Sequence, residues 1–194
     1  MRLPYRLDGL LTRPLIEARL ATVRPFFAEG TRLLDVGCGL TNLPGRVGPY
    51  LGCDRSRELL DENRRRHPES HFVLWDVESE EAPEAVRAAG PFDVVLLLAL
   101  LEHLAEPARA VARMAPLLAR TGHLVATTPS PSGRVPLRLG AALGLLSRHA
   151  ADEHEAFLSR ADLEAAGTAA GLRLVHHRYF LLGLNQVVVF SRAG

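Results

Sequence analysis

Short, continuous apolar runs alternate along the chain with longer stretches in which apolar residues recur every three or four positions. Runs that are apolar throughout predict strands covered on both faces, whereas the longer spacing predicts amphipathic helices. Five runs fall in the first two thirds of the chain: Arg32–Val36, Tyr50–Cys53, Phe72–Trp75, Phe92–Leu101 and His123–Thr128. The pattern therefore predicts five buried strands separated by helical segments.

Helical stretches precede and separate these strands. An amphipathic helix over about residues 12–28 comes before the first strand, and Pro25 is expected to bend it or end it early. The helices predicted between strands cover Ser56–Arg66, Glu80–Ala89 and Pro107–Ala119. Alternation of strand and helix implies parallel pairing, and hence a doubly wound α/β sheet with helices on both faces.

The last part of the chain follows a different pattern. A helix is expected over Ser159–Ala170, and only a few residues around Gly183 separate two further strands, Leu172–Phe180 and Leu184–Phe190. So short a connection permits an antiparallel hairpin but not a helical crossover. We therefore predict a single domain, residues 1–194, with a Rossmann-like, mostly parallel seven-stranded sheet that ends in an antiparallel hairpin.

Composition narrows the classes of function. Of the 194 residues 47% are apolar, no apolar run approaches the length of a membrane span, and residues 1–10 lack the layout of a signal peptide. We therefore expect a cytoplasmic protein without a transmembrane segment. A net charge of +1 without a basic block argues against nucleic-acid binding. Cys38 and Cys53 lack metal-ligand spacing, so we expect reduced, buried thiols and no metal site.

A glycine-rich turn, Asp35-Val-Gly-Cys-Gly39, follows the first predicted strand. Glycines in such a turn let the backbone pass close to a ligand. The dinucleotide fingerprint would need another glycine where Asn42 stands, so the turn disfavours a nicotinamide oxidoreductase. The acidic residue before the first glycine suits a ligand with an ammonium group better than a pyrophosphate.

Two more carboxylates end the next two predicted strands. Asp54 ends the second strand, where an acidic residue can accept hydrogen bonds from both ribose hydroxyls, and Asp76 ends the third. Parallel strands bring these ends to one edge of the sheet, so the two side chains and Asp35 are expected to line that edge. An alternative for Asp54 is that it caps the helix beginning near Ser56.

These motifs resemble those of the class I S-adenosylmethionine-dependent methyltransferases, in particular the small, type 11-like branch. The matching segments are Leu34–Gly39, Gly52–Asp54, Phe72–Asp76, Phe92–Val95, Leu101–Leu104 and the C-terminal hairpin. The resemblance implies that the cofactor is S-adenosylmethionine and the product S-adenosylhomocysteine.

The resemblance also implies a role for each matching position. The Gly37 and Gly39 backbone would contact the methionine part, Asp35 would lie near its amino group, and a backbone group near Leu97 would also touch it. Asp54 would bind the ribose, with Arg55 in the same cofactor site, and Asp76 would bind adenine together with the Val77 amide.

Two departures from the family pattern stand next to the turn. Thr41 occupies the position where the family often has a third glycine. The stretch from Gly39 to Tyr50 is short and rich in proline and glycine, so at most one or two helical turns fit there. We therefore expect backbone amides and an arginine, rather than a full helix end, to hold the methionine carboxylate.

The expected reaction is methyl transfer to a small-molecule or glycan- or lipid-linked acceptor. His103 is the candidate catalytic residue, as a proton acceptor or orienter, although Glu102 and His103 could instead begin the next helix and hold the loop. His154 could close over the acceptor or lie on a solvated helix face. His176 and His177 alternate along a strand, which argues against a joint site.

An insert over about residues 129–158 follows the fifth strand, where open α/β sheets bind ligands. Its apolar segment Val135–Leu146 could form a wall for an amphiphilic acceptor such as a glycolipid, or could simply pack on the sheet. The alternative to an enzyme is a non-catalytic, methyltransferase-like module that binds S-adenosylmethionine or S-adenosylhomocysteine as a regulatory ligand. The sequence leaves the oligomeric state open.

Overall fold

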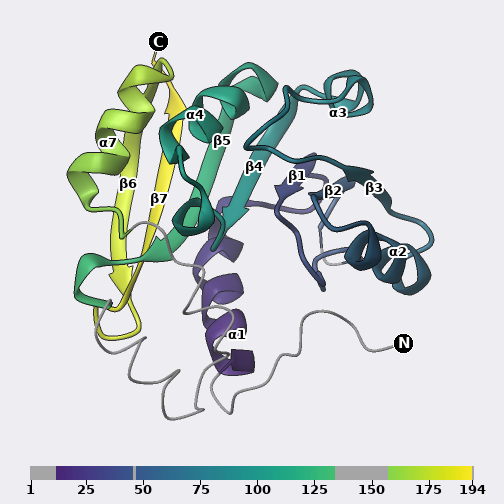
Figure 1. Cartoon of the computed structure of the whole chain (residues 1–194), viewed down its shortest axis with the longest axis horizontal. Coiled ribbons are helices and arrows are strands. Elements are labelled where there is room, and N and C mark those ends of the chain that lie inside the picture. Colours follow the sequence, from purple (N-terminus) through teal and green to yellow (C-terminus); the bar gives the residue numbers. More distant parts are fainter. Residues whose placement is uncertain (1–11, 46, 134–156, 194) are drawn as a thin grey trace.

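The computed structural model describes residues 12–45, 47–133 and 157–193, which contain one seven-stranded sheet (Figure 1). The strands lie in the order β3-β2-β1-β4-β5-β7-β6. Their bounds are β1 Leu33–Val36, β2 Tyr50–Asp54, β3 His71–Leu74, β4 Phe92–Leu98, β5 Leu118–Pro129, β6 Leu172–Phe180 and β7 Asn185–Arg192.

The pairing of these strands confirms the predicted topology. Strands β1 to β5 pair in parallel, while β7 pairs antiparallel with both β5 and β6. The chain runs outward from β1 through β2 to β3 and then returns to place β4 on the other side of β1. The carboxyl ends of β1 and β4 therefore flank the point where strand order reverses, which is where open α/β sheets bind ligands.

Helices cover both faces of the sheet, also as predicted. Val23 of α1 and Leu60 of α2 belong to one buried apolar cluster, while Val86 of α3, Val111 of α4 and Leu163 of α7 belong to the other. These helices are α1 Thr12–Val23, α2 Arg57–Arg66, α3 Glu84–Ala89, α4 Pro107–Met114 and α7 Arg160–Ala169.

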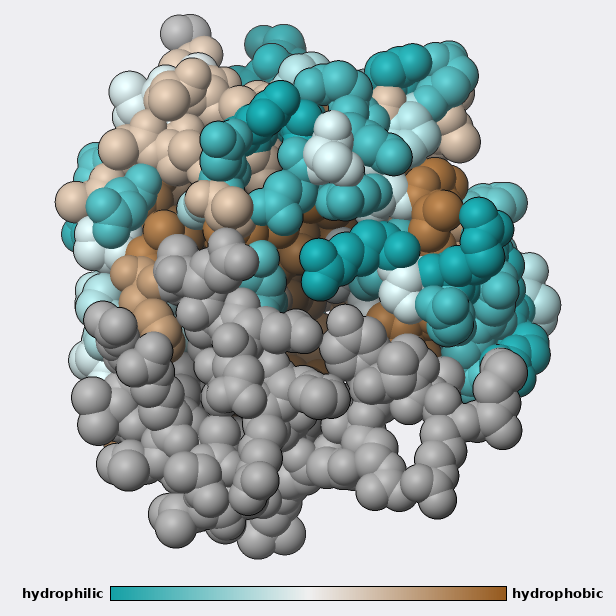
Figure 2. Space-filling model, viewed as in Figure 1, coloured by the Kyte–Doolittle hydropathy of each residue, from teal (hydrophilic) through white to brown (hydrophobic). Residues whose placement is uncertain are grey.

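Local chemistry sets where several helices begin and end. Pro25 lies in a short 3-10 turn, η1 (Arg24–Phe26), directly after α1, so the helix ends early as expected. Ser159 forms a capping box with Asp162 at the start of α7. The outer face of α2 is strongly hydrophilic, as the right-hand side of Figure 2 shows, while its Leu59 and Leu60 are buried.

Two strand boundaries, the end of β4 and the start of β5, lie furthest from the prediction. Strand β4 ends at Leu98 because Ala99 has a positive φ of 53°, and the next residues form a 3-10 turn, η2 (Leu101–His103), instead of continuing the strand. Strand β5 begins at Leu118, earlier than its apolar run, because a register shift opposite Phe92 lets the polar residues before His123 join it.

Parts of the predicted insert lie outside the described residues, including His154 and the apolar segment Val135–Leu146. Within the ranges that the structure describes, no helix is long and apolar enough to cross a membrane. Cys38 and Cys53 are both free thiols; Cys53 is fully buried, whereas Cys38 is partly accessible. His176 packs against Phe26.

Candidate cofactor site

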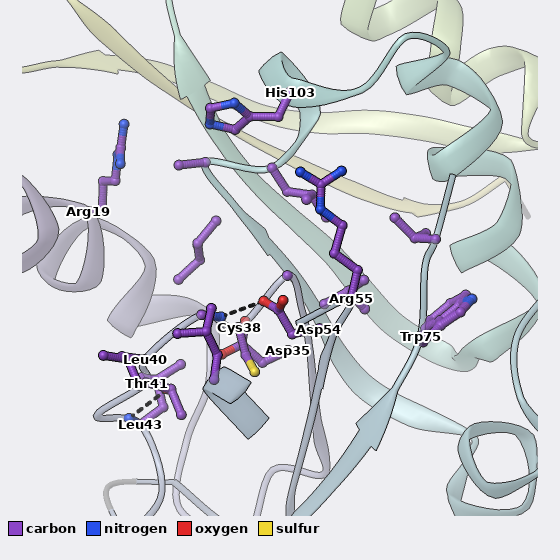
Figure 3. A pocket seen from close by; sticks show the side chains of 18 of the residues that line it. Arg19, Asp35, Cys38, Leu40, Thr41, Leu43, Asp54, Arg55, Trp75 and His103 are labelled. Atoms are coloured by element: carbon purple, nitrogen blue, oxygen red, sulfur yellow. Dashed lines mark hydrogen bonds between the residues drawn. The ribbon is translucent and has the colours of Figure 1, made fainter. Parts of the chain in front are cut away.

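A cavity of about 350 Å³ lies at the carboxyl ends of β1, β2, β3 and β4, with α1 forming its opposite wall (Figure 3). Seven of the eight predicted cofactor residues line it, and so does His103. Those seven are Asp35, Gly37, Gly39, Asp54, Arg55, Asp76 and Val77. The eighth, Leu97, is fully buried in the core, and the following residues Leu98, Ala99 and Leu100 line the cavity in its place.

The glycine turn leaves β1 with two residues in the left-handed region. Gly37 has φ 71° and Gly39 has φ 52°, a backbone conformation that side chains rarely adopt. A β-carbon on Gly37 would also come within 2.8 Å of Leu100 Cδ1. The Gly37 and Cys38 amides both donate to the Cys53 carbonyl, at 2.8 and 2.9 Å. The turn is therefore tied to the end of β2.

Asp54 organises the same turn through both oxygens of its carboxylate. Its Oδ2 accepts a 2.9 Å hydrogen bond from the Gly39 amide, and its Oδ1 accepts one of 2.9 Å from the Ser56 amide. The N-cap of α2 is Ser56, whose hydroxyl accepts from the Leu59 amide, so Asp54 is not the helix cap. Each carboxylate oxygen keeps a further lone pair for a ligand hydroxyl.

Asp35 is buried beneath the turn, with 3% of its surface exposed. The Tyr50 hydroxyl donates a 2.8 Å hydrogen bond to Asp35 Oδ2. Burial raises the pKa of the Asp35 carboxyl to about 7; the Tyr50 hydrogen bond opposes the rise and the Asp54 charge adds to it. A ligand cation at this carboxyl would therefore compensate a buried negative charge that nothing else neutralises fully.

Asp76 follows β3 and is held by its own loop. Its oxygens accept hydrogen bonds from the Glu78 amide at 3.0 Å and the Ser79 hydroxyl at 2.9 Å. Burial raises the pKa of Asp76, but hydrogen bonds from Glu78 and Ser79, together with the Arg55 charge, outweigh burial and the net pKa lies below its ordinary value. From α4, Arg113 donates to the carbonyls of Val77 and Glu78, which fixes the loop beside the cavity.

Asn63 braces the turn from α2 and was not identified from the sequence. It is fully buried; its amide nitrogen donates to the Gly39 carbonyl at 2.6 Å, and its amide oxygen accepts from the Thr41 amide at 3.2 Å. The described residues between Gly39 and Tyr50 contain no helix, as expected. A side chain thus supports the turn where the usual crossover helix is missing.

Arg19 of α1, which the sequence did not single out, is a candidate for the arginine expected to hold the methionine carboxylate. Its guanidinium lines the cavity and donates to Asn185 Oδ1 at 3.4 Å, while its buried Nε has no hydrogen-bond partner. Burial lowers the pKa of Arg19, and the nearby Glu102 carboxylate opposes that change. A buried cation with an unsatisfied donor is suited to binding an anionic ligand group.

The remaining predicted residues lie at the mouth of the cavity. Arg55 is exposed and extends from the end of β2 toward His103, which belongs to η2 on the opposite side of the opening (Figure 3). The α4 helix begins only at Pro107, so Glu102 and His103 do not start it. Trp75, another residue that the sequence did not single out, is almost fully buried and lines the floor.

These groups together fit a ligand that carries an ammonium group, a carboxylate and vicinal hydroxyls. Asp35 and Arg19 offer opposite charges on two walls of one cavity, and Asp54 lies between the glycine turn and α2. The chemistry of the cavity thus complements an amino-acid moiety joined to a ribose.

Comparisons with known proteins agree with this geometry. The methyltransferase-domain family matches residues 10–177 of the chain. A ubiquinone biosynthesis O-methyltransferase of Aeromonas salmonicida is 29% identical over 183 residues, which cover 84% of this chain and 77% of that enzyme. Similar enzymes of other bacteria align over only 41% to 52% of their own lengths, so the chain spans about half of these relatives.

Solved structures with the same fold include two methyltransferases. An S-adenosylmethionine-dependent methyltransferase of Mesorhizobium loti superposes with a TM-score of 0.71 at 19% identity, covering 90% of this chain and 98% of that one. Magnesium protoporphyrin IX methyltransferase of Synechocystis PCC 6803, solved with bound S-adenosylhomocysteine, superposes with a TM-score of 0.62 at 18% identity. The match covers 95% of this chain and 83% of that one. The chain therefore belongs to the methyltransferase-domain family and is a class I S-adenosylmethionine-dependent methyltransferase.

Proposed function

We propose that this protein transfers a methyl group from S-adenosylmethionine to a hydroxyl oxygen of a small-molecule acceptor. The observation that carries the proposal is the single cavity in which Arg19, Asp35 and Asp54 come together. The relatives named as O-methyltransferases support oxygen as the acceptor atom. The proposal includes acceptors whose hydroxyl belongs to a glycan- or lipid-linked molecule. It also places the reaction in the cytoplasm.

The charged groups of the cavity fit the two ends of the cofactor's methionine part. Arg19 would bind the carboxylate, because its unpartnered Nε lies buried at the cavity wall. Asp35 would lie near the ammonium group, whose charge favours the ionised form of a carboxyl that burial otherwise holds near neutrality. The Gly37 and Gly39 backbone would contact the methionine part as well, because glycines without side chains let a ligand approach the turn closely.

The nucleoside part would lie along the ends of β2 and β3. Asp54 would accept the ribose hydroxyls with its free lone pairs, and the carboxylate is already fixed by two backbone amides. Asp76 and the Val77 amide would bind the adenine edge, with the Trp75 side chain beneath them. The hydrogen bonds from Arg113 hold this loop in place before any ligand binds.

The bound cofactor supplies an electrophilic methyl group on a sulfonium ion. The protein's contribution is to hold an acceptor oxygen against it in line and to take up the oxygen's proton. His103 would accept that proton or orient the hydroxyl, because its imidazole lines the cavity on the side away from Asp54. No described residue besides His103 combines an imidazole with a place in this cavity.

Calorimetry with S-adenosylmethionine, S-adenosylhomocysteine and NAD, followed by a radiolabelled methyl-transfer assay, tests the proposal. The acceptor panel should contain free phenols as well as lipid-linked and glycan-linked hydroxyl compounds. We expect micromolar binding of the first two ligands, no binding of NAD, and transfer to at least one hydroxyl acceptor. Binding without turnover on any acceptor would instead support a regulatory module.

A further inference from the structure

The guanidinium of Arg55 lies near the Asp76 carboxylate, whose pKa its charge helps to lower, but the two groups form no direct ion pair. Some exposed arginines pair with a carboxylate three or four residues away, as Arg64 does with Asp61 and Arg87 with Glu84, whereas others such as Arg57 do not. Arg55 forms no ion pair with any described residue. Its side chain nevertheless lines the cavity, so its charge faces the space where ligands would bind.

The cavity carboxylates of Asp54 and Asp76 accept their hydrogen bonds from groups other than Arg55. Asp54 accepts two backbone amides, and Asp76 accepts an amide and the Ser79 hydroxyl. Arg55 extends past Asp54 toward His103 on the far side of the opening (Figure 3). The opening is therefore bordered by the Arg55 guanidinium and the His103 imidazole, while Asp35 is buried deeper in the cavity.

We propose that Arg55 contacts the acceptor oxygen and selects acceptors whose hydroxyl is acidic, such as phenols and enols, over neutral alcohols and over amines. This inference rests on the proposed function. A guanidinium stabilises a developing oxyanion through charge-assisted hydrogen bonds, which favours the ionised form of the acceptor. A protonated amine would be repelled by the same charge and by the sulfonium of the cofactor.

In this proposal His103 and Arg55 have separate roles at the opening of the cavity. The acceptor hydroxyl gives its proton to His103, or to water when it is acidic enough, and Arg55 holds the resulting oxyanion. The oxygen then forms the new carbon–oxygen bond as the sulfur–methyl bond breaks, and the electron pair of that bond stays on sulfur.

A chromogenic phenol measures this effect without turnover. We would titrate 4-nitrocatechol by absorbance in the complex of the protein with S-adenosylhomocysteine, which lacks the sulfonium charge. The bound phenol should have a pKa about one unit below that of the free compound, because a nearby cation favours the phenolate. Arg55→Gln should abolish the shift and weaken phenol binding about tenfold, whereas Arg55→Lys should keep part of it.

Two controls separate Arg55 from its neighbours. Arg57→Gln changes an exposed arginine at the start of α2 that does not line the cavity, and it should leave the shift intact. His103→Gln tests whether the imidazole causes the shift. The charged groups facing Arg55 are otherwise Asp54 and Asp76, with Asp35 and Arg19 deeper in the cavity, and all of these stay unchanged.

The outcomes distinguish this inference from the proposed function. If S-adenosylhomocysteine binds but Arg55→Gln leaves both the phenol's affinity and its pKa unchanged within twofold, the role of Arg55 is wrong and the proposed function stands. Failure of the wild-type complex to bind 4-nitrocatechol at millimolar concentration would also contradict the inference. If S-adenosylhomocysteine itself does not bind, the proposed function fails first.

Discussion

The two sides of the cavity differ in how fully their polar groups are hydrogen-bonded within the protein. On the side of β1, β2 and β3, the carboxylates of Asp35, Asp54 and Asp76 each receive hydrogen bonds from nearby protein groups. On the side of α1, Arg19 keeps an unsatisfied buried Nε. The buried Glu102 carboxylate of η2 lies near the Arg19 charge but does not line the cavity. On the acidic side, hydrogen bonds hold every carboxylate before a ligand arrives, whereas on the other side a buried donor has no partner.

The physical consequence is a difference in how each side responds to the ligand. The acidic side is preorganised, so binding there costs little reorganisation. Behind the other side, burial raises the pKa of Glu102, and the nearby Arg19 charge opposes that rise. The two buried charged groups therefore compensate each other only in part. A ligand carboxylate at Arg19 would supply the missing partner. The following changes test that contrast, beginning with the largest expected effect.

Asn63→Ala should be the most damaging change, because it removes the brace of the preorganised side. It leaves the Gly39 carbonyl and the Thr41 amide without their partners in a buried place, which should lower the free energy of unfolding by about 2–4 kcal/mol. Urea denaturation measures the loss. The exposed Asn42→Ala should cost less than about 0.5 kcal/mol, and equal losses in the two variants would argue against a bracing role.

Arg19→Met should weaken S-adenosylhomocysteine binding by about 1.5–3 kcal/mol, the value of a hydrogen bond to a charged group. Its stability should change little or increase, because methionine removes a buried and incompletely paired charge. Calorimetry and thermal denaturation measure the two effects on one sample. Arg24→Met, an exposed arginine directly after α1, serves as the control. An unchanged affinity for S-adenosylhomocysteine in Arg19→Met would show that Arg19 does not bind the ligand carboxylate.

Asp54→Ala should weaken S-adenosylhomocysteine binding by about 1–3 kcal/mol if the carboxylate binds the ribose hydroxyls. Because Asp54 also accepts the Gly39 and Ser56 amides, part of the loss should appear as lower stability. Asp61→Ala on the exposed face of α2 should have no effect on affinity. An affinity for S-adenosylhomocysteine equal to that of the wild type would remove Asp54 from the binding site.

The smallest predicted effect is a pH dependence set by Asp35. Its pKa of about 7 means that the carboxyl of the free protein holds a proton below pH 7, and an ammonium ligand must displace it. S-adenosylhomocysteine should therefore bind roughly tenfold more tightly at pH 7.5 than at pH 6. Asp35→Asn should bind more weakly and lose this dependence. If the affinity of Asp35→Asn still depends on pH in this range, a group other than Asp35 causes the dependence.

The same raised pKa has a consequence for stability. The folded protein holds the Asp35 proton at pH values where the unfolded chain has lost it, so this group's contribution to stability should fall as pH rises from about 4 to 7. Asp35→Asn should flatten that part of the stability profile, which urea denaturation at several pH values would show.

Local sequence patterns identified the acidic side of the site well. The Asp35 and Asp54 positions followed from strand ends, because parallel strands deliver their carboxyl ends to one edge. Arg19 and Asn63 escaped notice, although each is a polar residue on the apolar face of an amphipathic helix: Arg19 lies beside Ile16 and Val23, and Asn63 beside Leu59. That pattern does not say which ligand or loop the polar group will meet.

The sequence by itself determined the order of strands and helices, the closing hairpin and the three acidic strand ends. Each depends on periodicity or on the length of a connection, and such information is local. Only the tertiary structure decided that α1 brings Arg19 to the cavity, that Asn63 replaces a missing helix as support for the turn, and that Arg55 points toward His103. These contacts join residues far apart in the chain, and side-chain packing fixes them.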